Sequence, residues 1–242
     1  MESVMIQGAS RGIGLEFCKQ LSERGTRVVA TARAPERSSE LQELAKRQKH
    51  ISIEKVDLLD ESTLEKAAER LAARGESLRW IINVAGLLHG HGVVPEKKLS
   101  QIDPEQLVSA FRINTVGPAL VAKHFASFMQ GSPAVFASLS ARVGSISDNR
   151  LGGWYGYRCS KAAQNMLTKN LSIELKRRIK DACVVALHPG TVDTDLSRPY
   201  QRSAKVVFST QKAVQSLLKV LDGLTSAENG RFFAWDGTDI PW

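Results

Sequence analysis

The chain has 242 residues, a formal net charge of +8 and 43% apolar residues. That apolar fraction supports a hydrophobic core and excludes an intrinsically disordered chain. The positive charge does not predict a nucleic-acid interface, because acidic and basic residues are interspersed and the densest basic cluster, at 176–180, lies where a helix is expected to end.

The cysteines and the apolar runs indicate where the protein works. Cys18, Cys159 and Cys183 do not have the spacing of a metal-binding motif, and Cys18 and Cys183 fall in helix and strand patterns. This predicts buried thiols in a reducing compartment and no metal. No apolar run is long enough to cross a membrane, and a strand expected from Ser3 leaves no room for a signal peptide. We therefore expect a cytoplasmic protein with no membrane partner; an organellar protein whose targeting segment was removed is the alternative.

Short apolar runs alternate with amphipathic segments along the whole chain. Strands are expected at 4–6, 27–30, 51–56, 80–82, 134–136, 183–187 and 231–234. Helices are expected at 15–24, 64–74, 157–176 and 210–221. The alternation predicts a doubly wound parallel α/β sheet, a Rossmann fold, with about seven strands flanked by helices in a single domain over 1–242.

A further helix is expected to begin near Asp103. Asp103 has the character of an N-cap, Pro104 that of the first helical residue, and Gln106 lies where its side chain would complete a capping box. Asn114 falls within this helix, an unfavourable place for asparagine that suggests a functional reason for its presence.

A glycine-rich turn follows the first expected strand and precedes a helix. Its sequence is Gly8-Ala9-Ser10-Arg11-Gly12-Ile13-Gly14. Glycines there allow a tight turn, close approach of the backbone to a pyrophosphate, and close packing of helix on sheet. The phosphates would bind the free N–H groups of the helix N-terminus. Glycines alone are weak evidence, but their position in the first βαβ unit favours dinucleotide binding.

The end of the second expected strand indicates which dinucleotide binds. The segment 31–33 ends in Arg33 and contains no acidic residue for a ribose 2′-hydroxyl. Arg33 and Arg11 would instead flank a 2′-phosphate, so NADP(H) is favoured over NAD(H). The alternative is that both arginines are simply exposed.

Two tyrosines, Tyr155 and Tyr157, open the longest expected helix. Lys161 lies four positions after Tyr157, on the same helix face, whereas Tyr155 has Cys159 at that offset. A nearby ammonium favours a phenolate and lowers its pKa toward neutral pH. The spacing therefore favours Tyr157 over Tyr155 as an acid–base group.

Taken together, the chain resembles the short-chain dehydrogenase/reductases in their compact single-domain form, over essentially its whole length. The motifs that carry this resemblance are Gly8 to Gly14, Asp57-Leu58, Asn83-Val84-Ala85-Gly86, Asn114, Tyr157-x-x-x-Lys161, and Pro189-Gly190 with Thr194. Within the family, the segment 140–146 and Trp235-Asp236-Gly237 are most similar to the C-factor and sniffer-type carbonyl reductases.

The resemblance implies a role for each of these positions. Tyr157 would protonate the carbonyl oxygen, Lys161 would hold the nicotinamide ribose, and Asn114 would hold a water in a proton relay. The implied cofactor-binding residues are Gly8, Ser10, Arg11, Gly12, Ile13, Gly14, Arg33, Asp57, Leu58, Asn83, Ala85, Gly86, Tyr157, Lys161, Pro189, Gly190, Val192 and Thr194.

The serine that the family places after the fifth strand is the ambiguous position. Aligned through Gly144, the family's serine falls on Ala141, directly after Ser140. We take Ser140 as the candidate and keep Ser138 and Ser145 as alternatives.

Two functions follow as hypotheses. The first is an NADP(H)-dependent oxidoreductase that acts on a small carbonyl or alcohol substrate, with substrate loops at 87–98, 145–154 and 194–208. The second is an NADP(H)-binding redox-sensing or C-factor-like signalling protein with little or no catalysis. The resemblance also implies a homodimer or homotetramer that pairs through the helices carrying Asn114 and Tyr157.

Overall fold

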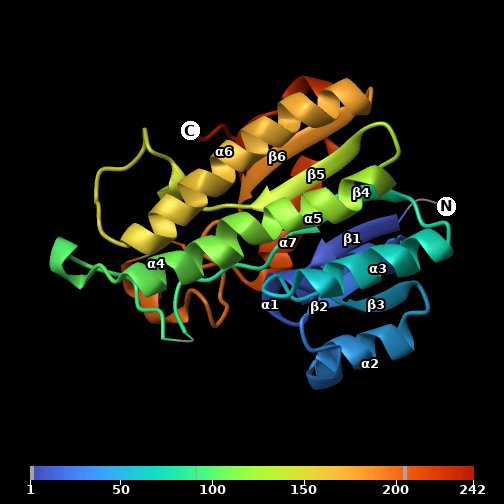
Figure 1. Cartoon of the computed structure of the whole chain (residues 1–242), viewed down its shortest axis with the longest axis horizontal. Coiled ribbons are helices and arrows are strands. Elements are labelled where there is room, and N and C mark those ends of the chain that lie inside the picture. The colour runs from blue at the N-terminus through green and yellow to red at the C-terminus, as the bar shows by residue number, and fades with distance from the viewer. Residues whose placement is uncertain (1–2, 91, 204–205) are drawn as a thin grey trace.

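Seven parallel strands form one twisted sheet in the computed structural model, which describes residues 3–90, 92–203 and 206–242 (Figure 1). The strand order is β3-β2-β1-β4-β5-β6-β7. The strands are β1 (Ser3–Gln7), β2 (Arg27–Ala32), β3 (Ile51–Lys55), β4 (Leu78–Asn83), β5 (Ala134–Leu139), β6 (Ala182–His188) and β7 (Phe232–Ala234). The chain runs from β1 out to β3, returns to β4 and continues to β7. The predicted fold class is therefore confirmed.

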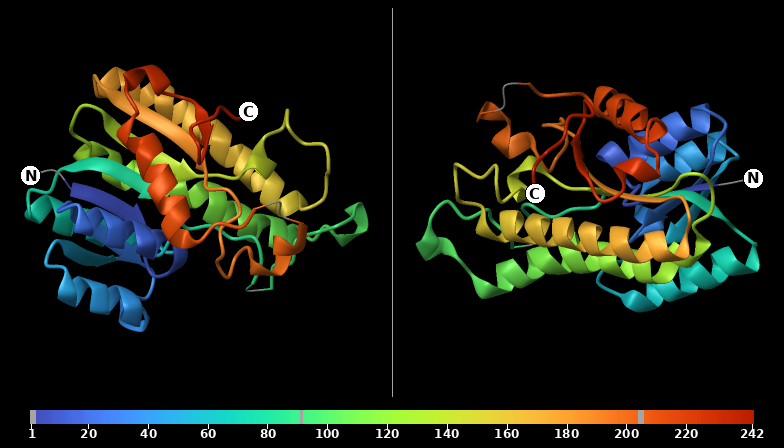
Figure 2. Two further views of the ribbon diagram at one scale, coloured as in Figure 1. Left: turned by 180° about the vertical axis from the view of Figure 1, so that it is seen from behind. Right: turned by 90° about the horizontal axis from the view of Figure 1, so that it is seen from above.

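Helices cover both faces of this sheet (Figure 2). They are α1 (Gly12–Glu23), α2 (Ser39–Arg47), α3 (Glu61–Ala73), α4 (Pro104–Phe111), α5 (Gly117–Phe125), α6 (Tyr155–Arg178) and α7 (Thr210–Asp222). Residues of α1, α2 and α7 share one hydrophobic cluster with the strands, and residues of α3, α5 and α6 share another. The two clusters are the two layers of the core, and the sheet lies between them.

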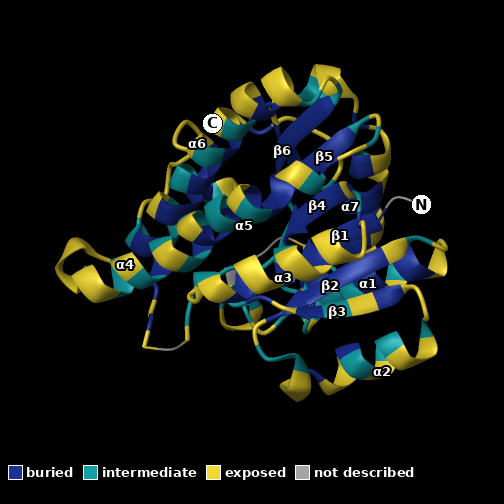
Figure 3. Ribbon diagram, turned by 45° about the vertical axis from the view of Figure 1, so that its right-hand side comes forward, coloured by how far each residue is buried: buried dark blue, intermediate teal, exposed yellow. Residues whose placement is uncertain are grey.

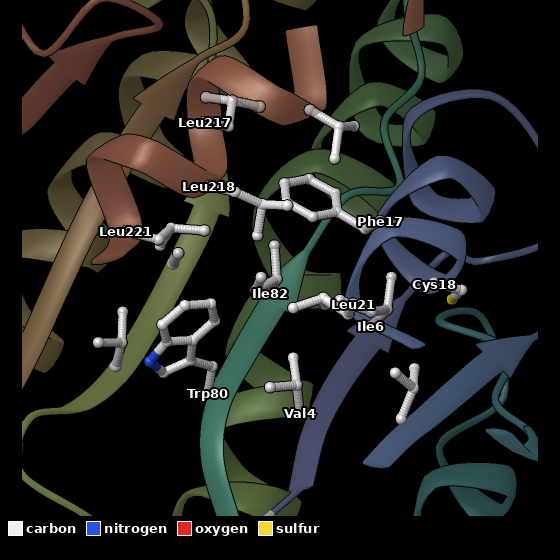
Figure 4. Close-up of a cluster of buried hydrophobic side chains, with 14 of the residues drawn as sticks. Val4, Ile6, Phe17, Cys18, Leu21, Trp80, Ile82, Leu217, Leu218 and Leu221 are labelled. Atoms are coloured by element: carbon white, nitrogen blue, oxygen red, sulfur yellow. The ribbon is translucent and has the colours of Figure 1, made fainter. Parts of the chain in front are cut away.

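Alternation along the strands assigns side chains to the two layers. Val4 and Ile6 of β1 point into the first cluster, whereas Met5 between them points into the second. In the first cluster, Trp80 and Ile82 of β4 lie near Leu217, Leu218 and Leu221 of α7 and Phe17 and Leu21 of α1 (Figure 4). Figure 3 shows the result: the inner strands are almost entirely buried, the edge strand β3 is partly exposed, and the helices keep an exposed outer face.

The start of α4 confirms one prediction and corrects another. The Asp103 carboxylate accepts a hydrogen bond from the Gln106 backbone N–H at 2.9 Å, so Asp103 is the N-cap. The predicted capping box is wrong, because the Gln106 side chain accepts instead from the backbone N–H of Val94 at 2.9 Å. The segment that contains Val94 lies against the start of α4. The Val94 N–H group binds the Gln106 side-chain oxygen, which a capping box would need as its acceptor.

Some helical elements differ from their predicted extents. α1 begins at Gly12, inside the glycine turn, and α6 extends from Tyr155 to Arg178. Asn114 does not lie in a continuous α-helix. It lies in η3 (Arg112–Val116), a π-helical turn between α4 and α5, in which the Gly117 N–H bonds to the Arg112 carbonyl. Such turns are rare and are frequent at functional sites.

None of the helices in the described part of the chain combines the length and the apolar character that crossing a membrane requires.

Replacing Phe17 with alanine tests the first core layer. Its side chain is fully buried among α1, α7 and the sheet. We expect Phe17→Ala to lower the free energy of unfolding by about 3–5 kcal/mol, because it removes apolar contacts and leaves a cavity. Urea denaturation measures the change, with Glu23→Ala at the exposed end of the same helix as the control. An equally small decrease in the free energy of unfolding in both variants would contradict the placement of Phe17 in the core.

Candidate active site

The predicted site residues converge at the carboxyl ends of the central strands. The glycine turn follows β1, Asn83 ends β4, the candidate serines lie at the end of β5 and just after it, and Pro189 follows β6. The connection leaving β1 runs to β2, whereas the connections from β4 onward run toward β7. In open α/β sheets, ligands bind at this reversal, outside the carboxyl ends of the strands.

The glycine turn is packed too closely for side chains. A Cβ on Gly8, whose φ is +88°, would lie 2.8 Å from the Ala85 nitrogen. A Cβ on Gly14 would lie 2.1 Å from the Gly8 carbonyl oxygen. Among the described residues, no side chain caps the N-terminus of α1, whose N-cap is Arg11. The first-turn N–H groups are thus available to an anionic group such as a phosphate.

A segment after β6 lies against the glycine turn. A Cβ on Gly12 would be 3.4 Å from Cγ2 of Thr194, and Arg11 Nη1 lies 3.2 Å from Asp195 Oδ2. Both members of this ion pair are well exposed, so it contributes little stability. Arg33, the other predicted phosphate ligand, is exposed directly after β2. The structure thereby brings the glycine turn and the segment 194–195 together, although they are distant in sequence.

The residues predicted to border the adenine and the sheet have defined local contacts. The Asp57 carboxylate accepts from the Leu59 N–H at 3.0 Å, and Leu58 packs on Gly117 at the start of α5. Asn83 is buried and donates to Ser138 Oγ at 3.3 Å. Its Oδ1 has no hydrogen-bond partner among the described residues.

Asn114 joins three segments. Its Oδ1 accepts from the Leu87 N–H at 2.7 Å, and its Nδ2 donates to the Leu87 carbonyl at 2.8 Å and to Ser160 Oγ at 2.9 Å. Gly86 lies between Asn114 and Lys161, because a Cβ there would be 3.4 Å from Asn114 Oδ1 and 3.6 Å from Lys161 Nζ. The asparagine side chain therefore links the π-helical turn, the segment after β4, and α6.

Lys161 and Tyr157 lie together on α6, as their spacing predicted. Lys161 is buried, and its Nζ donates to the Leu139 carbonyl at 2.8 Å and to Gln164 Oε1 at 2.9 Å. Burial lowers the pKa of Lys161 to about 7 and raises the pKa of Tyr157 above its ordinary range. The lowered Tyr157 pKa expected from its spacing to Lys161 is therefore wrong for this structure, because the cost of burying a phenolate exceeds the effect of the ammonium. Lys161 Nζ lies 5.9 Å from the centroid of the Tyr157 ring. The arrangement places a cation within electrostatic reach of a phenol.

The three candidate serines have different partners. Ser140 is buried and its Oγ donates to Asn165 Oδ1 at 2.6 Å. Ser138 Oγ accepts from Asn83, and Ser145 Oγ accepts from the Asp148 N–H at 3.1 Å. Asn165 was not predicted, although its position four residues after Lys161 puts it on the same helix face.

Gly190 is surrounded by aromatic side chains that the sequence did not indicate. Its φ is +78°, and a Cβ there would lie 2.8 Å from the Phe208 ring and 3.2 Å from Trp235 Cδ1. The Phe208 and Trp235 rings have centroids 4.6 Å apart. Val192 is buried directly after this turn, and its carbonyl accepts from Thr194 Oγ1 at 3.4 Å.

A chain of aromatic rings connects the three predicted substrate loops. Trp154 lies edge-on to Tyr157 and to Tyr200, with centroids 6.3 Å and 5.0 Å apart, and His89 lies 5.6 Å from Tyr200. Trp154 has a φ of +50°, and among the described residues it is the one non-glycine residue with a positive φ. Residues 91 and 204–205 of the predicted loops lie outside the described residues.

The start of α6 is held by another residue that was not predicted. Both carboxylate oxygens of the buried Glu96 lie 3.2 Å from the Gly156 nitrogen. A carboxylate at a helix N-terminus satisfies free N–H groups and complements the helix dipole. Sequence contained no local signal for this contact, because its partners are 60 residues apart.

One group of side chains outside the site has metal-ligating character. Glu61, Glu65 and His124 bring their ligand atoms within 4.8 Å of one another on α3 and α5. Lys123 Nζ lies 2.6 Å from Glu61 Oε1, so a cation of the protein already neutralises this carboxylate.

Replacing Gly144 with alanine tests how closely α6 approaches the end of β5. A Cβ on Gly144 would lie 2.7 Å from Lys161 Cβ and 3.0 Å from the Lys161 carbonyl carbon. We expect Gly144→Ala to destabilise the protein by about 1–3 kcal/mol through overpacking, measured by thermal or urea unfolding. Gly223→Ala is the control, since a Cβ there meets only ordinary contacts at 3.6 Å. Unchanged stability of Gly144→Ala would show that α6 can move away freely.

Comparison with known proteins places this geometry in a family. The family model described as short chain dehydrogenase matches residues 2–205. An NADPH-bound carbonyl reductase from chicken fatty liver is 30% identical with a TM-score of 0.90, covering 100% of this chain and 94% of that one. The carbonyl reductase Sniffer of D. melanogaster is 29% identical with a TM-score of 0.89, covering all of both chains. The C-signal protein of Myxococcus xanthus is 36% identical over 145 residues, which are 60% of this chain and 83% of that protein. The chain therefore belongs to the short-chain dehydrogenase family of oxidoreductases.

Proposed function

We propose that the protein is an NADP(H)-dependent carbonyl reductase that interconverts a small aldehyde or ketone and its alcohol. The observation that carries this proposal is the pair formed by Tyr157 and the buried Lys161 at the ligand-binding end of the sheet. Two structurally similar proteins, from chicken liver and D. melanogaster, are carbonyl reductases.

The residues at the site fit a phosphorylated dinucleotide. The turn at Gly8 and Gly14 has no room for a Cβ, and the first turn of α1 has N–H groups free of a side-chain cap among the described residues. Arg11 and Arg33 would bind the 2′-phosphate, and Asp57 the adenine. The segment from Pro189 to Thr194 would hold the carboxamide. When bound, the nicotinamide supplies a hydride to the carbonyl carbon or accepts one from the alcohol. The carbonyl reductase from chicken liver binds NADPH.

Tyr157 would supply the proton that completes carbonyl reduction. Because burial raises the pKa of Tyr157, its phenol is protonated at neutral pH and can donate to the oxygen of a carbonyl. The phenolate that remains is stabilised by the Lys161 ammonium. Ser140 would orient the substrate oxygen, with Ser138 and Ser145 as alternatives.

Asn114 would act in part by positioning. Its amide is engaged with both backbone groups of Leu87 and with Ser160, so it holds the segment after β4 against α6. Both Nδ2 hydrogens are engaged and Oδ1 already accepts one hydrogen bond, so the relay role implied for Asn114 would use the second lone pair of Oδ1 or the backbone carbonyl.

The substrate would lie among the loops 87–98, 145–154 and 194–208. His89, Trp154 and Tyr200 supply one aromatic ring from each of the three loops.

For the protein as a whole we propose a cytoplasmic homodimer or homotetramer. Exposed apolar side chains on the helices predicted to pair support the oligomer, namely Val108, Val116, Met166 and Ile173.

The second candidate function is NADP(H)-dependent sensing or signalling. The similarity to the C-signal protein favours it. Ser140 also donates its hydroxyl hydrogen to Asn165. The serine that would orient the substrate oxygen therefore already has a partner, which would weaken catalysis. The two candidates differ in whether the bound cofactor is consumed.

Replacing Tyr157 with phenylalanine separates these candidates. We expect Tyr157→Phe to bind NADPH as the wild type does and to reduce carbonyls about 10²–10⁴-fold more slowly, because the proton donor is lost. NADPH binding by fluorescence and NADPH consumption with a panel of aldehydes and ketones measure the two properties. Tyr155→Phe is the matched control and should remain active. If the wild type binds NADPH but consumes none with any carbonyl, the sensing function is favoured instead.

Reversing the charge of Arg33 tests the cofactor assignment. We expect the wild type to prefer NADPH over NADH, and Arg33→Asp to lose about 10–100-fold in NADPH affinity by losing a charged contact to the 2′-phosphate. NADH affinity should stay the same or increase. Arg177→Asp at the far end of α6 gives the same change of net charge without a change in preference. A wild type that prefers NADH would overturn the assignment.

A further inference from the structure

The inward face of α6 is polar along most of its length. Lys161, Gln164, Asn165, Thr168 and Ser172 are all at most 4% exposed. Thr168 and Ser172 bond to carbonyls of their own helix, and Asn165 binds Ser140 and the Gly144 carbonyl. Gln164 is the member of this group whose side chain binds Lys161.

The contact to Lys161 determines the orientation of the Gln164 amide. An ammonium only donates hydrogen bonds, so the atom 2.9 Å from Lys161 Nζ must be the oxygen, Oε1. Nε2 consequently points away, and it has no hydrogen-bond partner among the described residues although Gln164 is only 1% exposed.

Fold stability does not explain this glutamine. A buried amide N–H₂ without an acceptor costs stability, whereas an apolar side chain of similar size would fill the same space without that cost. The presence of a polar residue at position 164 is therefore better explained by its hydrogen bond to Lys161.

The charge of Lys161 has neutral partners. Its two acceptors, the Leu139 carbonyl and Gln164 Oε1, are uncharged, and it forms no ion pair with a described residue. The groups facing it are Tyr157 on its own helix, Gly144 after β5, and Gly86 with Asn114 on the opposite side. Each of the two neutral oxygens thus supplies a large share of the stabilisation of the buried ammonium.

We propose that Gln164 is a positioning residue for Lys161, whose amide oxygen holds the ammonium at the end of β5 and keeps it protonated while Tyr157 reacts. This inference rests on the proposed reductase function. In this role the Gln164 amide oxygen offsets part of the free-energy cost of burying the Lys161 charge, which the reaction requires.

The pH dependence follows from this arrangement. Burial lowers the pKa of Lys161 to about 7, and both acceptors oppose that shift by stabilising the charged form. Carbonyl reduction needs the charged form, so the rate should fall as the pH rises through the pKa of Lys161. Removing Gln164 Oε1 lowers this pKa further and moves the fall in rate to lower pH.

The test compares Gln164→Met, which has a similar length and no polar atom, with Gln164→Glu. In Gln164→Met we expect a pH profile displaced downward by about one unit, which from a pKa of about 7 corresponds to about fivefold lower kcat at pH 7. NADPH affinity should change less than about twofold. In Gln164→Glu the added carboxylate raises the pKa of Lys161, so the profile should move to higher pH.

A second readout needs no activity. In protein labelled with [ε-¹³C]lysine, NMR titration follows Lys161, and Lys161→Met identifies its signal. The Lys161 signal should titrate at lower pH in Gln164→Met and at higher pH in Gln164→Glu. Ser172→Ala is the control, because its hydroxyl donates to the Lys169 carbonyl of the same helix and, within the described part of the chain, makes no hydrogen bond with Lys161.

The outcomes separate the two proposals. Unchanged titration of Lys161 and superimposable pH profiles in both variants would overturn the role of Gln164. A loss of Tm in Gln164→Met, together with an unshifted profile in Gln164→Glu, would show a purely structural role and would also overturn it. If the wild type reduces no carbonyl but the NMR titrations shift as expected, the reductase function fails while the control of Lys161 by Gln164 stands.

Discussion

The buried ammonium of Lys161 joins helix α6 to the carboxyl end of β5, and the geometry of the site follows from this contact. Where Nζ reaches the Leu139 carbonyl, α6 lies so close to the end of β5 that Gly144 has almost no room for a side chain. The same approach puts Asn165 beside Ser140 and Asn114 beside Ser160. An ammonium that forms no ion pair with a described residue is expensive to bury, and the surrounding helix face is polar.

Burial acts in opposite directions on the two neighbouring groups. It raises the pKa of Tyr157 and lowers that of Lys161 to about 7, because in each case it disfavours the charged form. The phenol is therefore protonated at neutral pH, and the lysine is near its midpoint. Divergent environments of this kind are typical of acid–base sites. The charge on Lys161 is consequently sensitive to small changes in its acceptors, of which Gln164 is one.

The aromatic rim of the site is built by segments with little regular structure. Trp154 adopts a left-handed conformation that is unfavourable for a bulky residue, and it contacts both Tyr157 and Tyr200. Glu96 holds the adjacent helix start from a different segment. Strained residues persist where their surroundings restrict them on several sides, and such positions are concentrated at functional sites. The loops predicted to bind the substrate are thus ordered by contacts with one another.

The sequence by itself determined the alternation of strands and helices, the parallel sheet, the glycine turn and the spacing of Tyr157 to Lys161, because each is a local pattern repeated at fixed intervals. Local patterns did not predict the π-helical turn at Asn114, and they predicted a capping box at Gln106 that is not formed. Only the tertiary structure decided which acceptors hold Lys161, which partner each serine has, and that Glu96 and the aromatic rings meet at the start of α6. These contacts join residues that are mostly far apart in the chain, and their formation depends on how helices and loops pack around the finished sheet.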